Sequence, residues 1–348
     1  MRKKILHILN TGSYSGAENV AITTINNMSL DYDFAYASLR GGIEEVLNEN
    51  NIEYYPLSKM SIKEIKKVIK MYKPDIIHAH DYTSSIYSAL STSNKIIVSH
   101  LHNNSPWIKK INLRSIVFLL SSFRYSKVIT VSSSITDEYI FSKFIRKKSM
   151  VVHNPTNLNL IRKLSTISKD TCETKYDLIF LGRLAKAKDP LRFINIVKKI
   201  KEENPKIKAV MVGSGPLDNN CIELINANGL EDTISILGFL KNPYEILNQS
   251  KVLILTSKWE GYGLVAIEAM SLGKPVLATP VGGLQEIISE KCGFFCKTDD
   301  EFRERVRSIL SDIKLYNLLS KASMERAEAF SNIENYINSI NKIYKSFD

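Results

Sequence analysis

The stretch KVLILTSKWEGYGLVAIEAMSLGKPVLATP, residues 251–280, decides the fold class. It begins with an apolar run of strand length and passes through a turn that contains two glycines. An apolar segment of helical length follows, and Gly273 ends it before a second short apolar run closed by Thr279 and Pro280. A strand, a turn, a helix and a strand in that order predict a parallel sheet covered by helices.

The same alternation of short apolar runs with segments of helical period occurs along most of the chain. The segments that show it are 3–9, 17–28, 75–80, 95–102, 127–132, 208–216 and 234–240. The pattern pauses at the polar stretch 162–175, which we take as a domain boundary. We therefore expect an α/β protein with two doubly wound parallel sheets. The first domain covers 1–165, the second 166–330, and a C-terminal helix in 331–348 packs back on the first.

Composition indicates a globular protein with a basic first domain. The chain has 348 residues, 44% of them hydrophobic, and a net charge of +11. Residues 1–160 hold 20 Lys and Arg against 12 Asp and Glu, a net charge of +8. The apolar part of the opening segment is too short for a secretory signal, and the apolar stretch 115–123 falls well below the roughly 20 residues that span a bilayer. We therefore expect a cytoplasmic protein.

The four cysteines favour reduced thiols rather than a metal site. Cys292 and Cys296 have three residues between them, which is not the spacing of a zinc ribbon, and Cys172 and Cys221 lie far from them. We predict no metal and no cofactor.

The turn at 257–263 places two glutamates where a ligand could meet them. Two doubly wound sheets leave a cleft at the carboxyl ends of their strands, where such folds bind ligands. Glu260 lies in the turn, and Glu268 lies in an otherwise apolar helix face, where a carboxylate needs a partner. Gly261 and Gly263 allow a tight bend that presents N–H groups to an anion. Carboxylates that accept bonds from hydroxyls, beside an anion site, suit a sugar nucleotide.

Other strand ends carry weaker signals. Gly12 and Gly16 flank a loop that opens a helix, where backbone N–H groups could hold a phosphate, although any such turn uses glycine. The turn at Gly213 gives the same ambiguous signal. Arg183 and Lys188 follow the first strand of the second domain and could neutralise a diphosphate, or form an ordinary solvated basic turn.

These segments together resemble a known enzyme family. EGYGLVAIE, residues 260–268, resembles the E-x7-E signature of retaining glycosyltransferases of family 4, which have the GT-B fold of two Rossmann-like domains facing a central cleft. SGAE (15–18) is similar to that family's glycine loop, and VVHNP (151–155), GRLAKAKDP (182–190) and GKPVLATPVGGLQEI (273–287) continue the match in order. The first loop departs from the family, because Ser15 and Gly16 stand where many relatives carry Gly-Gly.

The resemblance implies a role for each matching residue. Glu268 would bind the ribose of the nucleotide, and Glu260 the hydroxyls of the donor sugar. Arg183 and Lys188 would bind the diphosphate without a metal ion. The remaining implied donor contacts are the backbones of Gly16, Gly213, Tyr262, Gly263 and Leu264.

The run 95–102 ends in two candidate histidines, His100 and His102. His102, followed by Asn103, resembles the family's histidine near the donor sugar, and His100 is the match if the register differs by two. From the residues alone, a core histidine is the default interpretation for either, as it is for His7, His78 and His80.

The acceptor is expected on the first domain. Basic and apolar residues mix over helix length in 108–127, and this segment could lie on an anionic membrane where lipid-linked acceptors are found. An ordinary helix with a basic outer face is the alternative.

The sequence thus predicts a retaining, metal-independent glycosyltransferase, cytoplasmic or peripheral on the inner face of the membrane. It would move a sugar from a nucleotide donor, expected to be a UDP-sugar, to a surface polysaccharide or a lipid-linked glycan. A sugar-nucleotide epimerase or hydrolase of the same fold is the alternative enzyme. A nucleic-acid-binding protein is suggested only by the charge, and no stacking or recognition motif supports it.

Overall fold

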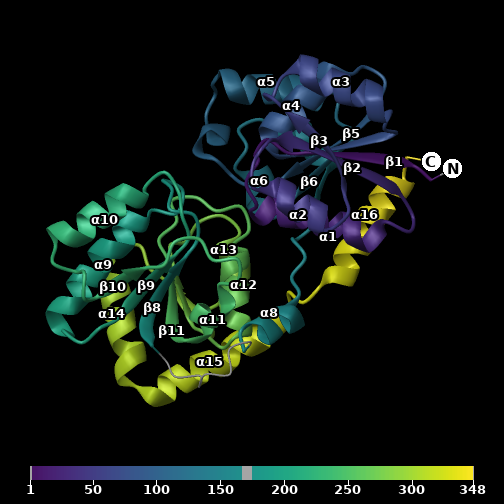
Figure 1. The fold of residues 1–348 in the computed structure, drawn as a ribbon. Helices are drawn as coiled ribbons and strands as arrows, with labels where there is room; N and C mark the ends of the chain where they lie inside the picture. Colours follow the sequence, from purple (N-terminus) through teal and green to yellow (C-terminus); the bar gives the residue numbers. More distant parts are fainter. Residues whose placement is uncertain (1, 167–174, 348) are drawn as a thin grey trace. The chain divides into compact units, whose positions relative to one another are not determined.

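The computed structural model describes residues 2–166 and 175–347 and divides them into two compact units. The first unit contains the residues up to Pro155 together with those from Ile333 onward, and the second contains Thr156–Asn332. Each unit is built around one parallel sheet covered by helices (Figure 1). The prediction of an α/β chain with two parallel sheets is confirmed.

The sheet of the first unit has seven parallel strands in the order β3-β2-β1-β4-β5-β6-β7. The strands are β1 Lys4–Ile8, β2 Asp33–Leu39, β3 Glu53–Leu57, β4 Ile76–His80, β5 Ile96–Leu101, β6 Lys127–Thr130 and β7 Ser149–Val151. Successive strands extend the sheet in one direction from β1 to β3 and in the other from β4 to β7. The order therefore reverses between β1 and β4, which makes their carboxyl ends the switch point of this sheet.

Helices cover both faces of this sheet (Figure 1). They are α1 Gly16–Met28, α2 Ile43–Glu49, α3 Ile62–Tyr72, α4 Asp81–Ser91, α5 Leu113–Ser122, α6 Ser133–Asp137, α7 Ser142–Ile145 and α16 Ile333–Lys345, with short 3-10 turns η1 Pro106–Lys109 and η2 Arg146–Lys148. The helices α1 and α16 lie on one face, and α3, α4 and α5 lie on the other.

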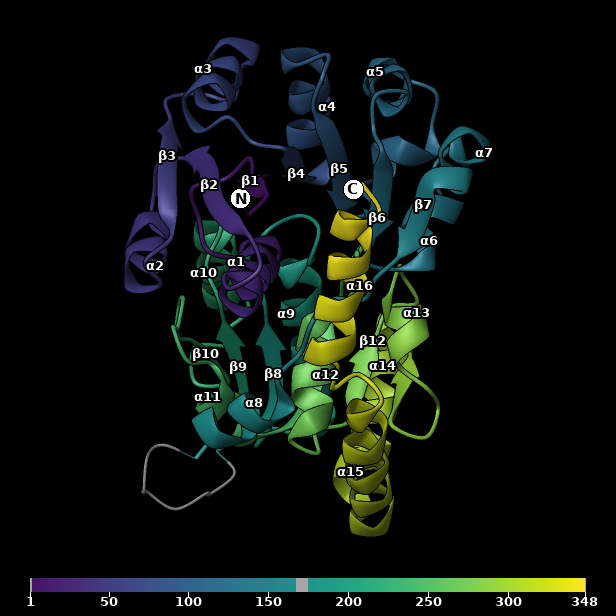
Figure 2. The same cartoon turned by 90° about the vertical axis from the view of Figure 1, so that its right-hand side faces the viewer.

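The last helix, α16, is part of the core of the first unit (Figure 2). Its buried residues pack with Ile5, Ile76 and Val98 of the central strands. The hydroxyls of Tyr336 and Thr24 lie 2.8 Å apart, which ties α16 to α1. The C-terminal segment thus completes the apolar cover that α1 alone leaves open.

The second unit has a six-stranded parallel sheet in the order β10-β9-β8-β11-β12-β13. The strands are β8 Tyr176–Leu181, β9 Ala209–Val212, β10 Ile234–Ile236, β11 Ser250–Leu255, β12 Val276–Ala278 and β13 Gly293–Phe295. The helices are α8 Leu158–Leu164, α9 Pro190–Glu203, α10 Asp218–Ala227, α11 Tyr244–Asn248, α12 Leu264–Ser271, α13 Leu284–Ile287, α14 Asp299–Ser311 and α15 Ile313–Glu328. Here the order reverses between β8 and β11, so this sheet has its switch point at their carboxyl ends.

The units divide about ten residues before the boundary that the sequence suggested. We expected the change after residue 165, in a polar stretch without periodicity, of which 167–174 lie outside the described residues. The helix α8 occupies the first part of that region and packs against α11 and α12, so it belongs to the second unit. Within the described residues, no helix is long and apolar enough to cross a membrane.

Three cysteines, Cys221, Cys292 and Cys296, are free and buried, as expected for reduced thiols. Cys172 lies outside the described residues.

Candidate functional site

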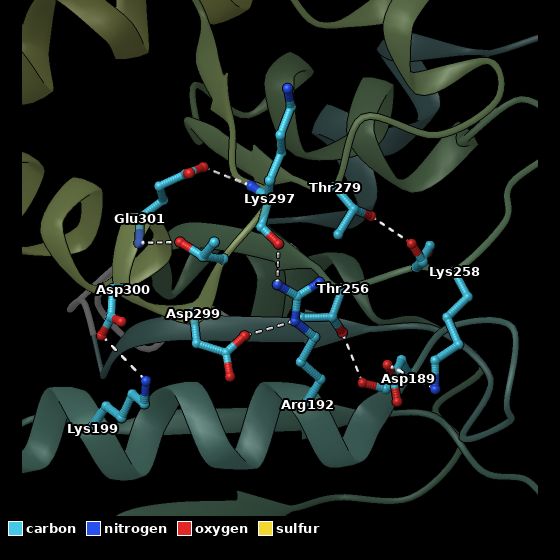
Figure 3. Close-up of polar contacts among 12 residues, drawn as sticks. Asp189, Arg192, Lys199, Thr256, Lys258, Thr279, Lys297, Asp299, Asp300 and Glu301 are labelled. Carbon is cyan, nitrogen blue, oxygen red and sulfur yellow. Dashed lines mark hydrogen bonds and ion pairs between the residues drawn. The ribbon is translucent and has the colours of Figure 1, made fainter.

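The turn after β8 is fixed against the end of β11. The Thr256 hydroxyl donates to the carbonyl oxygens of Lys188 and Asp189, each at 2.9 Å. Lys258 pairs with the Asp189 carboxylate at 3.0 Å, and Figure 3 shows Asp189 between Thr256 and Lys258. The Lys258 amide donates to the carbonyl oxygen of Ala187 at 2.8 Å. These bonds hold the backbone of Lys188 at the switch point of the second sheet.

Lys188 and Glu260 form an ion pair at this switch point. The Lys188 ammonium contacts Oε2 of Glu260, and the Ser257 hydroxyl donates to the same oxygen at 3.4 Å. Only 23% of the lysine side chain and 13% of the glutamate side chain are exposed. The two predicted donor-site residues, 72 positions apart in the sequence, are therefore brought together by the fold.

Glu268 lies on α12 close to the same lysine. The Tyr244 hydroxyl donates to its Oε1 at 3.4 Å. Desolvation by burial raises the pKa of Glu268 from 4.5 to about 7, although the Tyr244 hydrogen bond and the charge of Lys188 act in the opposite direction. A carboxyl group that changes charge near neutral pH thus lies beside the ion pair.

The helix α12 begins directly after a left-handed turn. Gly263 has φ 100°, and a Cβ at this position would lie 2.5 Å from Cδ2 of Leu284 and 3.6 Å from Cγ of Glu260. Because the helix starts at Leu264, its first N–H groups have no acceptor within the helix. Glycine here permits the turn that places these donors beside Glu260, and the donor contacts of Tyr262, Gly263 and Leu264 stay predictions.

Arg183 and Gly213 occupy the neighbouring turns. Arg183 is exposed just after β8, and within the described residues it makes no ion pair. A Cβ on Gly213 would lie 2.0 Å from the carbonyl oxygen of Gly182. The Gly213 amide donates to the carbonyl oxygen of Gly238 at 2.8 Å. The structure therefore gives Gly213 a packing role, and its contact with a donor stays a prediction.

The switch point of the first sheet contains a cavity of about 180 Å³. The residues after β1, those after β4 and the start of α1 line it, together with a segment after β5: Leu9, Asn10, Thr11, Ala17, Glu18, His80, Asp81, Tyr82, Thr83, Asn103, Ser105 and Trp107. The cavity combines two carboxylates with an indole ring and several hydroxyl and amide groups. Such a lining suits a neutral, hydroxyl-rich ligand.

Asp81 is the most constrained residue of this cavity. It has φ 65°, a left-handed conformation that costs energy for a residue other than glycine. Its Oδ1 accepts from the His102 amide and from the Asn103 side chain, both at 3.0 Å. Burial, the largest effect, raises the pKa of Asp81 to about 7. Sequence reasoning missed Asp81, whose only signal was its position directly after the strand run 75–80.

Glu18 folds back over the loop that contains Gly16. Its carboxylate accepts from Thr11 at 2.6 Å and from the hydroxyl of Ser15. Gly16 is the first residue of α1, so its position at a helix start is as expected. The Glu18 carboxylate already lies at that helix end, where it interacts favourably with the helix dipole. The proposed contact of Gly16 with a phosphate stays a prediction.

Five histidines form a hydrogen-bonded cluster on the sheet face that α16 covers. His7 Nδ1 lies 2.9 Å from His80 Nε2, and His80 Nδ1 lies 2.9 Å from His102 Nε2. His78 lies 3.1 Å from His100 and 2.6 Å from the Tyr344 hydroxyl. Burial lowers the pKa of each ring, to about 3 for His7 and His102, so the rings are neutral.

The position of the rings separates the two candidate histidines. His100 is fully buried, whereas His102 follows the end of β5 and is partly exposed. Nitrogens of His7, His78 and His80, and of His80, His100 and His102, lie within 4.8 Å of one another and are the groups that could hold a cation among the described residues. In the structure these nitrogens bond to one another at hydrogen-bond distances.

Two family models match most of the chain. The model of glycosyltransferase family 4 matches residues 33–160, and the model of group 1 glycosyl transferases matches residues 165–326. The chain belongs to the family of glycosyltransferases that these two models describe, group 1 and family 4. The division between the two models falls close to the division between the two units.

Relatives of this glycosyltransferase share modest identity. It is 29% identical to an uncharacterised glycosyltransferase of Methanocaldococcus jannaschii over 68% of this chain and 63% of that relative. It is 24% identical, over 96% of this chain and 97% of the relative, to the N-acetylgalactosamine-N,N'-diacetylbacillosaminyl-diphospho-undecaprenol 4-alpha-N-acetylgalactosaminyltransferase of Campylobacter jejuni.

The fold of this glycosyltransferase also matches solved structures. Anabaena HepE in complex with UDP-glucose superposes with a TM-score of 0.86 at 19% identity, over 99% of each chain. This likeness shows that the glycosyltransferase has the GT-B fold.

Proposed function

We propose that the chain transfers a sugar from a nucleotide donor, a UDP-sugar, to a lipid-linked glycan or a growing surface polysaccharide. The observation that carries the proposal is the cluster of Lys188, Glu260 and Glu268 at the switch point of the second sheet. A cation, an ionised carboxylate and a second carboxyl group beside the start of a helix match the chemistry of a sugar nucleotide. The complex of Anabaena HepE with UDP-glucose supports this choice of donor.

The ion pair suggests how the donor is received. Lys188 and Arg183 would bind the diphosphate, so Lys188 would exchange part of its contact with Glu260 for a phosphate oxygen. Glu260 would then accept bonds from the sugar hydroxyls, and Glu268 from the ribose. As the bond from sugar to diphosphate breaks, negative charge grows on the leaving group, and the two cations stabilise it. On this account the reaction needs no metal ion and no cofactor.

The cavity in the first unit would hold the acceptor. Glu18 and Asp81 would repel a phosphate but can accept bonds from sugar hydroxyls, while Trp107 offers a flat apolar surface. We therefore propose that the part of the acceptor that enters the cavity is an uncharged sugar. The name of the Campylobacter jejuni relative, which describes transfer to a sugar on diphospho-undecaprenol, supports a lipid-linked acceptor. With a lipid-linked acceptor of this kind, the enzyme would act at the cytoplasmic face of the membrane.

Retention of the anomeric configuration rests on the family resemblance. The test is transfer from a UDP-α-sugar to a lipid-linked acceptor, with the anomeric coupling constant of the product read by NMR. An α-linked product supports the proposal, and a β-linked product contradicts retention.

Dependence on acceptor tests the alternative enzymes of the same fold. An epimerase or a hydrolase would consume the donor at the same rate without acceptor. A transferase would release UDP in proportion to glycosylated acceptor.

A further inference from the structure

The helix α5 exposes an apolar face to solvent. Leu113, Ile116 and Leu120 point outward with 77%, 39% and 62% of their surface exposed, and Phe123 just after the helix is 64% exposed. Positions three and four apart lie on one side of a helix, so these residues form a continuous stripe. A helix on the surface of a globular protein normally turns such a stripe toward the core.

The inner face of α5 is correspondingly polar. Ser115, Ser121 and Ser122 are buried on it together with Phe118. The Ser115 hydroxyl donates to the carbonyl oxygen of Lys110 at 2.9 Å, and the Ser122 hydroxyl donates to that of Leu119 at 2.6 Å. These bonds satisfy the hydroxyls of Ser115 and Ser122, so α5 buries its polar face and leaves its apolar stripe exposed.

Neighbouring elements extend the stripe into a surface. The helices α4 and α7 pack against α5 and contribute Leu90 and Phe144, which are about half exposed. Ile111, just before α5, is also exposed. We call this set the α5 surface: Leu90, Ile111, Leu113, Ile116, Leu120, Phe123 and Phe144. Exposed apolar side chains gathered on neighbouring elements in this way mark an interaction site.

The segment that contains α5 is rich in cations. Residues 106–148 contain nine Lys and Arg against two acids, Asp137 and Glu138, a net charge of +7. The acids are engaged, because Glu138 pairs with Lys109 at 3.1 Å and Asp137 with Arg146 at 2.8 Å. Lys110, Arg114 and Arg124 are exposed beside the stripe. A partner that covers this surface must therefore be apolar in its interior and anionic at its boundary.

The α5 surface begins a few residues after the cavity lining of the first unit. The turn η1 joins them, because Trp107 lines the cavity and Ile111 lies on the surface four residues later. The Asn112 side chain donates to the carbonyl oxygen of Trp107 at 2.7 Å, which ties the start of α5 to this turn. The Tyr82 ring makes edge-on contacts with both Trp107 and Phe118 of α5, with ring centroids 4.8 and 4.9 Å apart.

We propose that the α5 surface docks on the interface of an anionic lipid bilayer. An apolar stripe bordered by Lys and Arg is the pattern of helices that lie in the plane of a membrane interface. With ten residues, α5 is about 15 Å long, too short to cross the roughly 30 Å hydrocarbon layer. The inference rests on the proposed function, since docking would bring a lipid-linked acceptor to the cavity beside Trp107.

Sedimentation with vesicles tests the proposal. The full chain is mixed with vesicles of phosphatidylcholine containing 30% phosphatidylglycerol, and in parallel with pure phosphatidylcholine. We expect the parent to sediment with the anionic vesicles, and Leu120→Ser with Phe123→Ser to lower the partition coefficient about tenfold or more. Lys110→Ser with Arg114→Ser should remove the preference for the anionic vesicles. A parent that stays in the supernatant with both lipids, or a double apolar variant that binds as the parent does, overturns the proposal.

A matched control separates loss of docking from loss of folding. Phe239 is 63% exposed on the second unit, so Phe239→Ser removes a comparable exposed ring and should bind vesicles as the parent does. The affected side chains are exposed, and thermal unfolding of all variants should match the parent. Failure of the two proposals is distinguishable. Transfer to a soluble acceptor without vesicle binding would contradict only the docking proposal. Vesicle binding without any transfer would contradict only the proposed function.

Discussion

The ammonium group of Lys188 contacts the carboxylate of Glu260 across the ends of β8 and β11, the two strands between which the order of the second sheet reverses. Each residue is therefore satisfied without a ligand. A diphosphate that binds Lys188 must compete with this contact, and the released carboxylate becomes an acceptor for hydroxyls. On the proposed function, binding of the two halves of a sugar nucleotide would be coupled through this one ion pair.

Glu260→Gln tests this coupling. Removing the carboxylate charge leaves Lys188 unpaired, so UDP should bind as tightly as in the parent or more tightly. Turnover should fall by about 10²-fold if the contact with the sugar strengthens in the transition state. Calorimetry with UDP and a transfer assay measure the two quantities, and the exposed Glu202→Gln serves as control. Weakened UDP binding in Glu260→Gln would show that the carboxylate does not compete with the diphosphate.

Glu268→Gln should weaken the binding of UDP and of the UDP-sugar by the same factor, because the proposed ribose contact does not depend on the attached sugar. Calorimetry with both ligands measures this. If only the binding of the UDP-sugar became weaker, Glu268 would contact the sugar and not the ribose.

The stability of Glu268→Gln should depend on pH in a defined direction. Burial raises the pKa of Glu268 from 4.5 to about 7, so between these values the folded state keeps a proton that the unfolded chain releases. The contribution of Glu268 to stability is therefore highest below pH 4.5 and falls as the pH rises to 7. The Tm of the variant minus that of the parent should increase from pH 5 to pH 8. A constant difference across that range would contradict the raised pKa.

Asp81→Asn tests the acceptor cavity. Asparagine tolerates the left-handed backbone of Asp81, so the fold should persist. We expect the KM for acceptor to rise about tenfold or more while UDP binding changes little, because Lys188 and Arg183, the proposed diphosphate ligands, lie in the second unit. Asp31→Asn, an exposed change in the same unit, is the control. An unchanged KM for acceptor in Asp81→Asn would contradict the proposal that this cavity binds the acceptor.

The sequence predicts the fold well because its strongest signals are local. Apolar runs such as 251–256 alternate with helical segments, and this pattern identifies parallel sheets without any long-range information. The short strands at the sheet edges are different. No distinct sequence pattern marks β3, where Pro56 interrupts the run, or β13, which has three residues.

The site could be predicted only in part, for a similar reason. Residues at strand ends, such as Lys188 and Glu260, were found from the turns that carry them. That they pair depends on strand order, which spacing along the chain does not reveal. The five-histidine cluster and the outward stripe of α5 depend on which face each residue takes in three dimensions. A basic, apolar segment alone could not show that Ser115 faces inward and Leu120 outward.

The most direct test of the central claim is calorimetric titration of UDP into the parent, Lys188→Ala and Arg183→Ala, with Lys186→Ala as a control in the same turn. The parent and the control should each bind one UDP per chain. Lys188→Ala and Arg183→Ala should each bind about 10- to 100-fold more weakly, because a charge-assisted contact to the diphosphate is lost. Equal affinity in the parent and Lys188→Ala, or no binding of UDP by the parent, would contradict a nucleotide-sugar site at the switch point of the second sheet.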